Sequence, residues 1–281
     1  MQPTRRQFVA ASAAATATVL PAGPALAQGQ PQSSSRLPVI RPPRLQAGDT
    51  LALVNPSGAI YERAPYEIAI ESLQALGFKV REAPHLRARR GHLAGTDAQR
   101  ASDVNAMFAD PGVHGILAMT GGSGGNRILP LLDYAAIRRT PKFLGGFSDT
   151  TALINAVNAR TGLVTFHGPV GVSEWNAFSV EHWRGAVMEG HALTLRNPLD
   201  KDDNLVPRTG RISTLRGGKA QGPLLGGNLA VLTSMAGSPY WPAFEGAILV
   251  LEDINEYIYR VDRMLSTLKI SGVLDRVAGV V

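Results

Sequence analysis

The sequence predicts an α/β protein with a parallel-sheet domain towards its N-terminus and a smaller α/β domain behind it. Short apolar runs at residues 50–54, 113–119 and 142–144 alternate with helical periodicity at residues 64–76 and 96–109. This alternation is typical of βαβ units, whose strands are parallel and covered on both faces. The 281 residues, 44% of them apolar, supply enough core for both parts. We therefore expect a flavodoxin- or Rossmann-like sheet first, and then a C-terminal domain that is incomplete in this sequence.

The chain begins with a predicted export signal. Thr4-Arg5-Arg6-Gln7-Phe8 precedes a small-residue apolar segment, Val9 to Leu20, and Ala25-Leu26-Ala27 supplies a cleavage site. The paired arginines favour the twin-arginine type over an ordinary Sec signal and predict a periplasmic protein. The segment is too short and too weakly apolar for a membrane anchor.

The charge distribution argues against a nucleic-acid partner. Five of the 28 Lys and Arg residues lie in residues 1–45, which contain no Asp or Glu, so residues 46–281 hold 23 basic against 22 acidic side chains. A nearly neutral body does not form a basic binding face. The chain has no Cys, which excludes disulfides, thiolate metal ligands and a Cys nucleophile.

Composition and periodicity divide the chain into predicted parts. In order, these are the signal peptide at 1–27, a Pro/Ser/Gln-rich linker at 28–46, the N-terminal domain at 47–170, an interdomain connection at 171–204 and the C-terminal domain at 205–281. The linker is predicted to be a flexible or extended tether outside the core. The connection reads as irregular and polar.

The C-terminal part shows a second strand and helix pattern. Gly226-Gly227-Asn228 leads into a predicted helix at 229–235, a buried strand covers 247–251 and a helix covers 257–268. Residues 277–281 read as another buried strand, and the sequence stops inside it. We expect from this that the chain is a fragment or a C-terminally truncated product.

Ser148 lies where a predicted strand turns into a helix. Phe143-Leu144-Gly145-Gly146 ends an apolar run, Ser148 follows one residue later, and helical periodicity begins at Ala152. This order is that of a nucleophile elbow, although Thr150 replaces the second glycine of the usual G-x-S-x-G pattern. Taken alone, the stretch favours a serine that caps the helix, with Asp149 at its positive end.

Residues 121–125, Gly-Gly-Ser-Gly-Gly, follow another predicted strand. They lack the lysine of a phosphate loop and do not fit the spacing of a dinucleotide fingerprint. Backbone N–H groups of such a loop can form an oxyanion hole near Ser148, because glycine permits close approach of a substrate carbonyl. The alternative is a flexible turn.

The acid and base candidates are less distinctive. Glu252 and Asp253 end the strand at 247–251, which is a position that delivers a side chain to a site but also suits solvated turn carboxylates. Six histidines precede Glu252, and His167 at a predicted strand end is the best local candidate for a general base. A structural or substrate-lining role for His167 is nevertheless the favoured interpretation. No His/Asp/Glu cluster has metal-binding spacing.

Taken together, these segments resemble the LD-carboxypeptidase family of serine peptidases, which includes muramoyltetrapeptide carboxypeptidases and microcin C self-immunity peptidases. The resemblance runs from Ala47 to the end. Its segments are Gly48-Asp49-Thr50 with Asn55-Pro56-Ser57, Leu93 to Asp97 with Arg100 and Asp103, Gly121-Gly122 with Arg127 to Asp133, Gly145 to Thr151, His167-Gly168-Pro169, Gly226 to Leu229, Leu251-Glu252-Asp253 and Tyr259 to Arg263.

The resemblance implies a Ser-Glu-His triad with Ser148 as nucleophile and Glu252 as the acid that orients the histidine. It implies an oxyanion hole from the backbone N–H of Asp149 and of Gly121 or Gly122, and a triad histidine downstream of residue 281. Substrate-lining residues are expected at Ser57, Ser123, His167 and Asn228. No metal or cofactor is implied.

The expected activity is hydrolysis of the terminal D-alanine from murein tetrapeptides through an acyl-enzyme. The glycine loop departs from the family pattern, because Thr120 and Ser123 stand where arginine and tyrosine are usual. This departure leaves open an amidase acting on a peptide-like toxin or another peptide. The missing histidine leaves open a catalytically inactive wall-peptide binder. The expected partner is a small peptide, and a homodimer is allowed.

Overall fold

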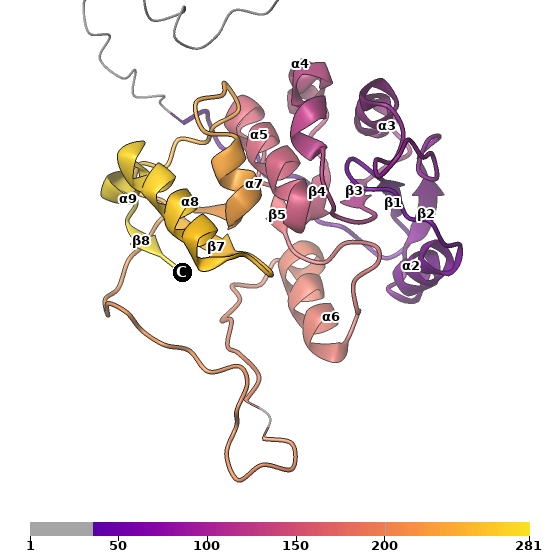
Figure 1. The fold of residues 1–281 in the computed structure, drawn as a ribbon. Coiled ribbons are helices and arrows are strands. Elements are labelled where there is room, and N and C mark those ends of the chain that lie inside the picture. The colour runs from indigo at the N-terminus through magenta and orange to yellow at the C-terminus, as the bar shows by residue number, and fades with distance from the viewer. Residues whose placement is uncertain (1–35, 200) are drawn as a thin grey trace, which may run out of the picture. The chain divides into compact units, whose positions relative to one another are not determined.

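The computed structural model describes residues 36–199 and 201–281. The predicted signal peptide lies outside these residues, so it and the export that it implies stay predictions. The described chain contains a five-stranded and a three-stranded parallel sheet, which confirms the predicted α/β class (Figure 1). None of the described helices is long and apolar enough to cross a membrane.

The first sheet has the strand order β2-β1-β3-β4-β5. Its strands are β1 (Thr50–Val54), β2 (Lys79–Glu82), β3 (Gly115–Ala118), β4 (Phe143–Gly146) and β5 (Phe166–His167). This order is of the flavodoxin type, in which the chain changes direction along the sheet between β1 and β3. Loops at the carboxyl ends of neighbouring strands therefore meet at one edge, where ligands bind in such sheets.

Helices cover both faces of this sheet, as the strand sequences require. In β1, Ala52 and Val54 belong to one core, while Leu51 and Leu53 belong to the other. Successive side chains of a strand point to opposite faces, so a strand that is apolar at every position needs two covering layers. Figure 1 shows α3 (Asp97–Ala109), α4 (Tyr134–Arg139) and α5 (Thr151–Thr161) on one side, and α2 (Ala64–Ala75) and α6 (Ala177–Arg184) on the other.

The second sheet has the order β6-β7-β8, with β6 at Leu224–Asn228, β7 at Ile248–Glu252 and β8 at Gly279–Val280. Its helices are α7 (Leu229–Ser234), α8 (Ile258–Ile270) and α9 (Val273–Arg276). Two hydrogen bonds attach β6 to α5: Asn155 Nδ2 donates to the Gly226 carbonyl at 2.8 Å, and the Asn228 N–H donates to Thr151 Oγ1 at 2.9 Å.

The prediction that residues 28–46 stay outside the core is wrong for the described part of that stretch. Ile40 forms a parallel bridge with Leu163, and Leu45 is 2% exposed and packs in the core beneath α2 and α6. Arg36 also donates to the carbonyls of Ala243 and Glu245. Ile40, Leu45 and Arg36 therefore attach the described part of this stretch to the folded chain.

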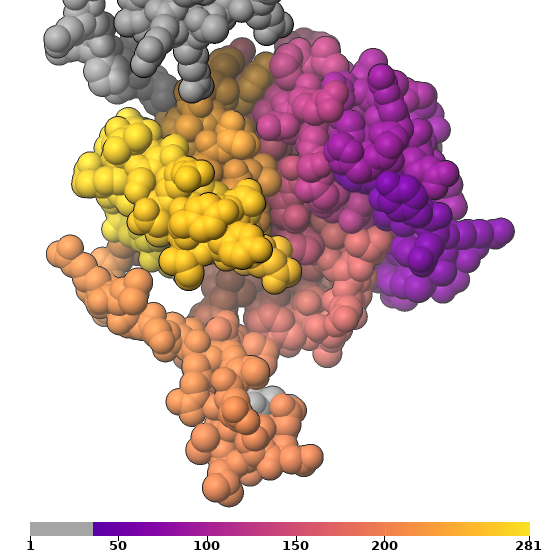
Figure 2. Space-filling view, in the orientation of Figure 1, coloured from indigo at the N-terminus to yellow at the C-terminus, as the bar shows by residue number. Residues whose placement is uncertain are grey.

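The predicted interdomain connection contains helical structure that the sequence did not predict. Residues 177–189 form α6 and a π-helix, η3 (Gly185–Glu189), with Trp183 and Val187 buried. Beyond them, residues 190–199 and 201–223 form no helix or strand, and Figure 2 shows the orange part of this segment projecting from the rest of the described chain. The second sheet begins at Leu224, later than the predicted domain start near residue 205.

Candidate active site

Ser148 has the backbone of a nucleophile elbow. It follows β4 as the first residue of a 3-10 turn, η2 (Ser148–Thr150), and its φ is +60°. A left-handed backbone costs a non-glycine residue roughly 1–2 kcal/mol, and such strain is found where a side chain must be held in one place. Ser148 is not the N-cap of either helix: Phe147 precedes η2 and Thr150 precedes α5, and neither makes a side-chain cap bond.

Gly146 allows the tight turn before Ser148. Its φ is +153°, and a β-carbon there would lie 2.8 Å from Thr150 Cγ2 and 3.0 Å from the Ala118 β-carbon. The first distance is shorter than β-carbons tolerate and the second is tight, so the turn strongly favours glycine. Steric crowding by Thr150 and Ala118 therefore explains why a glycine stands two residues before Ser148.

The glycine loop, residues 120–125, lies directly against Ser148. A β-carbon on Gly121 would be 2.7 Å from both Cβ and Oγ of Ser148 and 3.5 Å from the Asp149 backbone nitrogen. Gly121 and Asp149, the predicted oxyanion donors, thus both border the serine hydroxyl. Gly122 contacts a different neighbour, because a β-carbon there would lie 2.9 Å from Gly58 Cα.

The far end of the glycine loop is held by the Asp149 side chain. Asp149 is 5% exposed, and its Oδ2 accepts the Gly125 N–H at 2.7 Å. The residue after the nucleophile therefore contributes its backbone to the turn and its carboxylate to the neighbouring loop. Ser57 lies beside this contact and is fully buried, and its hydroxyl has no hydrogen-bond partner among the described residues, whereas Ser123 is exposed.

His167 lies beside the elbow, at the end of β5. Its strand partner is Gly146, its ring centroid is 6.3 Å from that of Phe147, and its Nδ1 lies 2.9 Å from where a β-carbon on Gly227 would be. It therefore stands where the two sheets meet. Desolvation lowers the pKa of His167, which favours the neutral ring that a general base requires.

Glu252 ends β7, where its strand partner is Asn228. Its Oε1 is buried and has no hydrogen-bond partner in the described chain. Burial raises the pKa of Glu252, the neighbouring Asp253 charge raises it further, and the Asn228 amide opposes both. A buried acceptor of this kind can receive the N–H of an imidazole ring.

Asn228 has well-defined structural partners. Its Oδ1 accepts the Val231 N–H as the N-cap of α7, and its Nδ2 donates to Asp253 Oδ1 at 3.2 Å. These bonds hold the carboxyl ends of β6 and β7 together beside Glu252. The predicted substrate-lining role of Asn228 stays a prediction, as do those of Ser57, Ser123 and His167.

Two supporting roles on the elbow helix were not predicted: Thr151 and Asn155 attach β6 to it. Nothing in their sequence spacing distinguishes these two from ordinary helix residues. Asp149 was predicted for its backbone N–H, but the role of its side chain in attaching the glycine loop was not. No group of three or more His, Asp or Glu side chains suited to a metal lies within residues 36–199 and 201–281.

A serine with a left-handed backbone after a parallel strand, with Gly121 and the Asp149 backbone beside it, is the arrangement of a serine hydrolase of the α/β class. Residues 51–168 match the LD-carboxypeptidase N-terminal domain and residues 221–281 match the LD-carboxypeptidase C-terminal domain. The chain belongs to the LD-carboxypeptidase family, and the predicted resemblance is confirmed.

Named relatives agree with this assignment. The chain is 36% identical to a probable murein peptide carboxypeptidase of Bacillus subtilis, over 85% of this chain and 73% of the relative. It is 34% identical to the murein tetrapeptide carboxypeptidase of Pseudomonas aeruginosa, over 76% and 69%. The structure of microcin C7 self-immunity protein MccF in complex with aspartyl sulfamoyl adenosine superposes with a TM-score of 0.74, at 29% identity over 85% of this chain and 78% of that one.

Proposed function

We propose that this protein is a serine LD-carboxypeptidase that removes the terminal D-alanine from murein tetrapeptides. The observation that carries the proposal is the contact between Gly121 and Ser148, which puts oxyanion donors beside a strained serine. The two carboxypeptidase relatives, whose names specify murein peptides, support the substrate class.

In the proposed mechanism, Ser148 Oγ attacks the carbonyl carbon of the bond to D-alanine and gives its proton to a histidine. The backbone N–H groups of Asp149 and Gly121 stabilise the tetrahedral oxyanion. The same proton then passes to the leaving amine, D-alanine departs, and water hydrolyses the acyl-enzyme. Glu252 holds the histidine in the tautomer that can accept the proton.

The identity of the base is part of the proposal. The family resemblance implies a histidine downstream of Glu252. Among the described residues, His167 lies beside the elbow with a lowered pKa, so it is the candidate within this part of the chain.

A second candidate function is hydrolysis of a peptide-like toxin. Thr120 and Ser123 change the polar character of the glycine loop, which is where a substrate's terminal group would be recognised. The structural likeness to MccF supports this alternative. A third candidate, an inactive wall-peptide binder, would bind tetrapeptide without cleaving it.

A comparison of substrates tests these candidates. We expect D-alanine release from a murein tetrapeptide with kcat/KM at least about tenfold above that for aspartyl sulfamoyl adenosine, since a site built for one terminal group rejects an analogue that lacks it. A tetrapeptide ending in L-alanine serves as the stereochemical control. Faster cleavage of the sulfamoyl adenosine would establish the toxin amidase, and tetrapeptide binding without release would establish the binder.

Because the pKa of Glu252 is raised, replacing this residue by glutamine is expected to increase the free energy of unfolding at high pH. A carboxyl group whose pKa is higher in the folded than in the unfolded state contributes stability that is lost as pH rises through the folded-state value. Glu252→Gln removes the charge, so we expect the variant to be more stable than wild type at pH 8, by up to about 1 kcal/mol. The difference should disappear at about pH 3, below the unfolded-state pKa, where Glu252 is protonated in both states.

Urea unfolding at the two pH values measures this difference. Glu71→Gln, on an exposed position of α2, is the matched control and should show no gain at pH 8. A Glu252→Gln variant less stable than wild type at pH 8 would contradict the conclusion that burial and the Asp253 charge disfavour the ionised Glu252 carboxyl.

A further inference from the structure

Arg100 is a buried cation in the first turns of α3. The residue is 1% exposed, and its side chain is 0% exposed. The start of its helix is fixed by a capping box, in which Thr96 Oγ1 accepts the Gln99 N–H and Gln99 Oε1 accepts the Thr96 N–H. A buried guanidinium is costly unless its charge and donors are matched, so its partners indicate its role.

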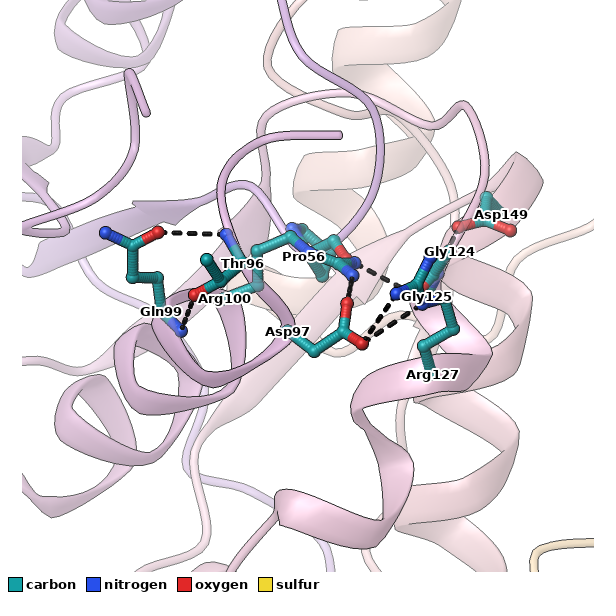
Figure 3. Close-up of polar contacts among 9 residues, drawn as sticks. All are labelled: Pro56, Thr96, Asp97, Gln99, Arg100, Gly124, Gly125, Arg127 and Asp149. Atoms are coloured by element: carbon teal, nitrogen blue, oxygen red, sulfur yellow. Dashed lines mark hydrogen bonds and ion pairs between the residues drawn. The ribbon is translucent and has the colours of Figure 1, made fainter. Parts of the chain in front are cut away.

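The Arg100 guanidinium joins two loops of the active site. Its Nη1 donates to the Pro56 carbonyl, in the loop after β1, and to the Gly124 carbonyl, in the glycine loop after β3, at 2.9 Å in the second case. Figure 3 shows the side chain reaching from α3 to both loops. The flat guanidinium can satisfy two carbonyls and a carboxylate at once, which the single ammonium of a lysine does with much poorer geometry.

Asp97 neutralises Arg100 and continues the network to Arg127. Arg100 Nη2 donates to Asp97 Oδ1 at 2.5 Å, and Arg127 donates from Nε and Nη2 to Asp97 Oδ2 at 3.1 and 2.9 Å. Desolvation opposes ionisation of Asp97, but the hydrogen bonds from Arg127 and Arg100 outweigh it and lower the pKa of Asp97. Arg127 belongs to η1 (Gly125–Leu131), the 3-10 helix that follows the glycine loop, so the network holds the loop and its exit together (Figure 3).

The same loops also bind each other and the elbow. The Gly58 N–H donates to the Gly121 carbonyl at 3.0 Å, and the Gly125 N–H donates to Asp149 Oδ2. Gly121, Gly124 and Gly125 are therefore held by three different partners within five residues of chain. Of these partners, only the Arg100 guanidinium binds a carbonyl in the loop after β1 and a carbonyl in the glycine loop at the same time. Its removal therefore frees Gly124 and Pro56 together.

We propose that Arg100 is a positioning residue that keeps the glycine loop against Ser148 by binding the carbonyls of Pro56 and Gly124. The proposal rests on the proposed function, because it assigns the Gly121 backbone to the oxyanion. Arg100 touches neither substrate nor Ser148; it acts through the loop. Its removal should weaken transition-state stabilisation more than substrate binding.

A purely structural role for Arg100 predicts something else. In that case its loss would lower the free energy of unfolding but leave the kcat of the folded molecules unchanged. Lys142 provides the matched control, since it is another buried cation, 8% exposed, that donates to two backbone carbonyls, those of Met107 and Asp110. These carbonyls belong to the opposite end of α3, so Lys142→Met imitates the loss of Arg100 away from the site.

The test compares Arg100→Met, Arg100→Lys and Lys142→Met in the full-length protein, with kcat normalised to the folded fraction. We expect Arg100→Met to lower kcat about 100-fold with KM within about threefold, as for a displaced oxyanion donor. Arg100→Lys keeps the charge beside Asp97, and we expect its kcat to be about tenfold below that of wild type. Lys142→Met should keep kcat within about twofold while losing stability.

Two further readouts separate positioning from folding. The inhibition constant of a peptidyl boronic acid, whose tetrahedral adduct occupies the oxyanion donors, should rise in Arg100→Met by about the factor by which kcat falls. In a Ser148→Ala background, the Kd for uncleaved tetrapeptide should not change on Arg100→Met.

The outcomes distinguish the two proposals. An unchanged kcat in folded Arg100→Lys and Arg100→Met, with an active wild type, would overturn the positioning role alone. If wild type cleaves neither substrate, the rate at which a fluorophosphonate labels Ser148 still reports on the loop, and an equal rate in wild type and Arg100→Lys would overturn the positioning role. Absence of labelling at Ser148 in wild type would overturn both proposals.

Discussion

Ser148→Ala is expected to abolish D-alanine release, with kcat lower by a factor on the order of 10⁶, as when the nucleophile of a serine peptidase is removed. Alanine can occupy the same backbone, so the strain at φ +60° is kept and the fold should not change. The loss would therefore be chemical. Residual hydrolysis from the oxyanion donors should remain above the uncatalysed rate.

Release of D-alanine from the murein tetrapeptide, measured by chromatography, checks this expectation. Ser234→Ala is the control, because Ser234 is an exposed serine at the end of α7 whose hydroxyl only bonds the Val231 carbonyl of its own helix. It should keep wild-type kcat. D-alanine release by Ser148→Ala at the wild-type rate would refute the assignment of the nucleophile.

Gly121→Ala is expected to lower kcat by a factor of about 10²–10³, the cost of losing a well-placed oxyanion donor. The new methyl group would start 2.7 Å from Ser148 Cβ and Oγ, so either the serine or the glycine loop must move. Gly121 does not have a left-handed backbone, so alanine is not strained by its own conformation there. The effect would come from the displaced neighbours alone.

Two glycine variants control for crowding and for the substitution itself. Gly115→Ala crowds the opposite end of β3, with a methyl group 2.6 Å from Leu51 Cδ2, and should lower stability but not the kcat of the folded fraction. Gly217→Ala meets no atom within 4 Å and should change neither. Equal kcat values for Gly121→Ala and Gly115→Ala would show that the contact with Ser148 has no catalytic consequence.

The elbow could be predicted because its requirements are local. A glycine that must avoid Thr150 and Ala118, a serine that follows it, and a helix behind them are adjacent in sequence. The capping box at Thr96 and the end of α2 before Gly77 were predictable for the same reason. Backbone conformation at these positions depends on residues within one or two turns.

Arg100 shows what could not be predicted. Its place in a polar helix suggests an exposed charge, and its burial depends on the loops after β1 and β3 closing over it. Trp183 and Val187 were missed likewise, since their stretch is mostly polar and only their packing on the first sheet makes it helical.

Asn228 was predicted to line the substrate. In the structure its side chain accepts the Val231 N–H as a helix cap and donates to Asp253.

The sequence by itself determined the family, the α/β class, the succession of strands and helices, and the serine on its turn. The family follows from the order of its motifs along the chain. The class, the succession of elements and the turn follow from apolar periodicity and from glycines at turns, which act over a few residues. The tertiary structure alone decided which groups meet. Gly121 touches Ser148, and Arg100 bridges Pro56 and Gly124, because the strand order brings the loops after β1, β3 and β4 to one edge of the first sheet. His167 approaches Gly227 because the bonds of Thr151 and Asn155 hold β6 of the second sheet against α5.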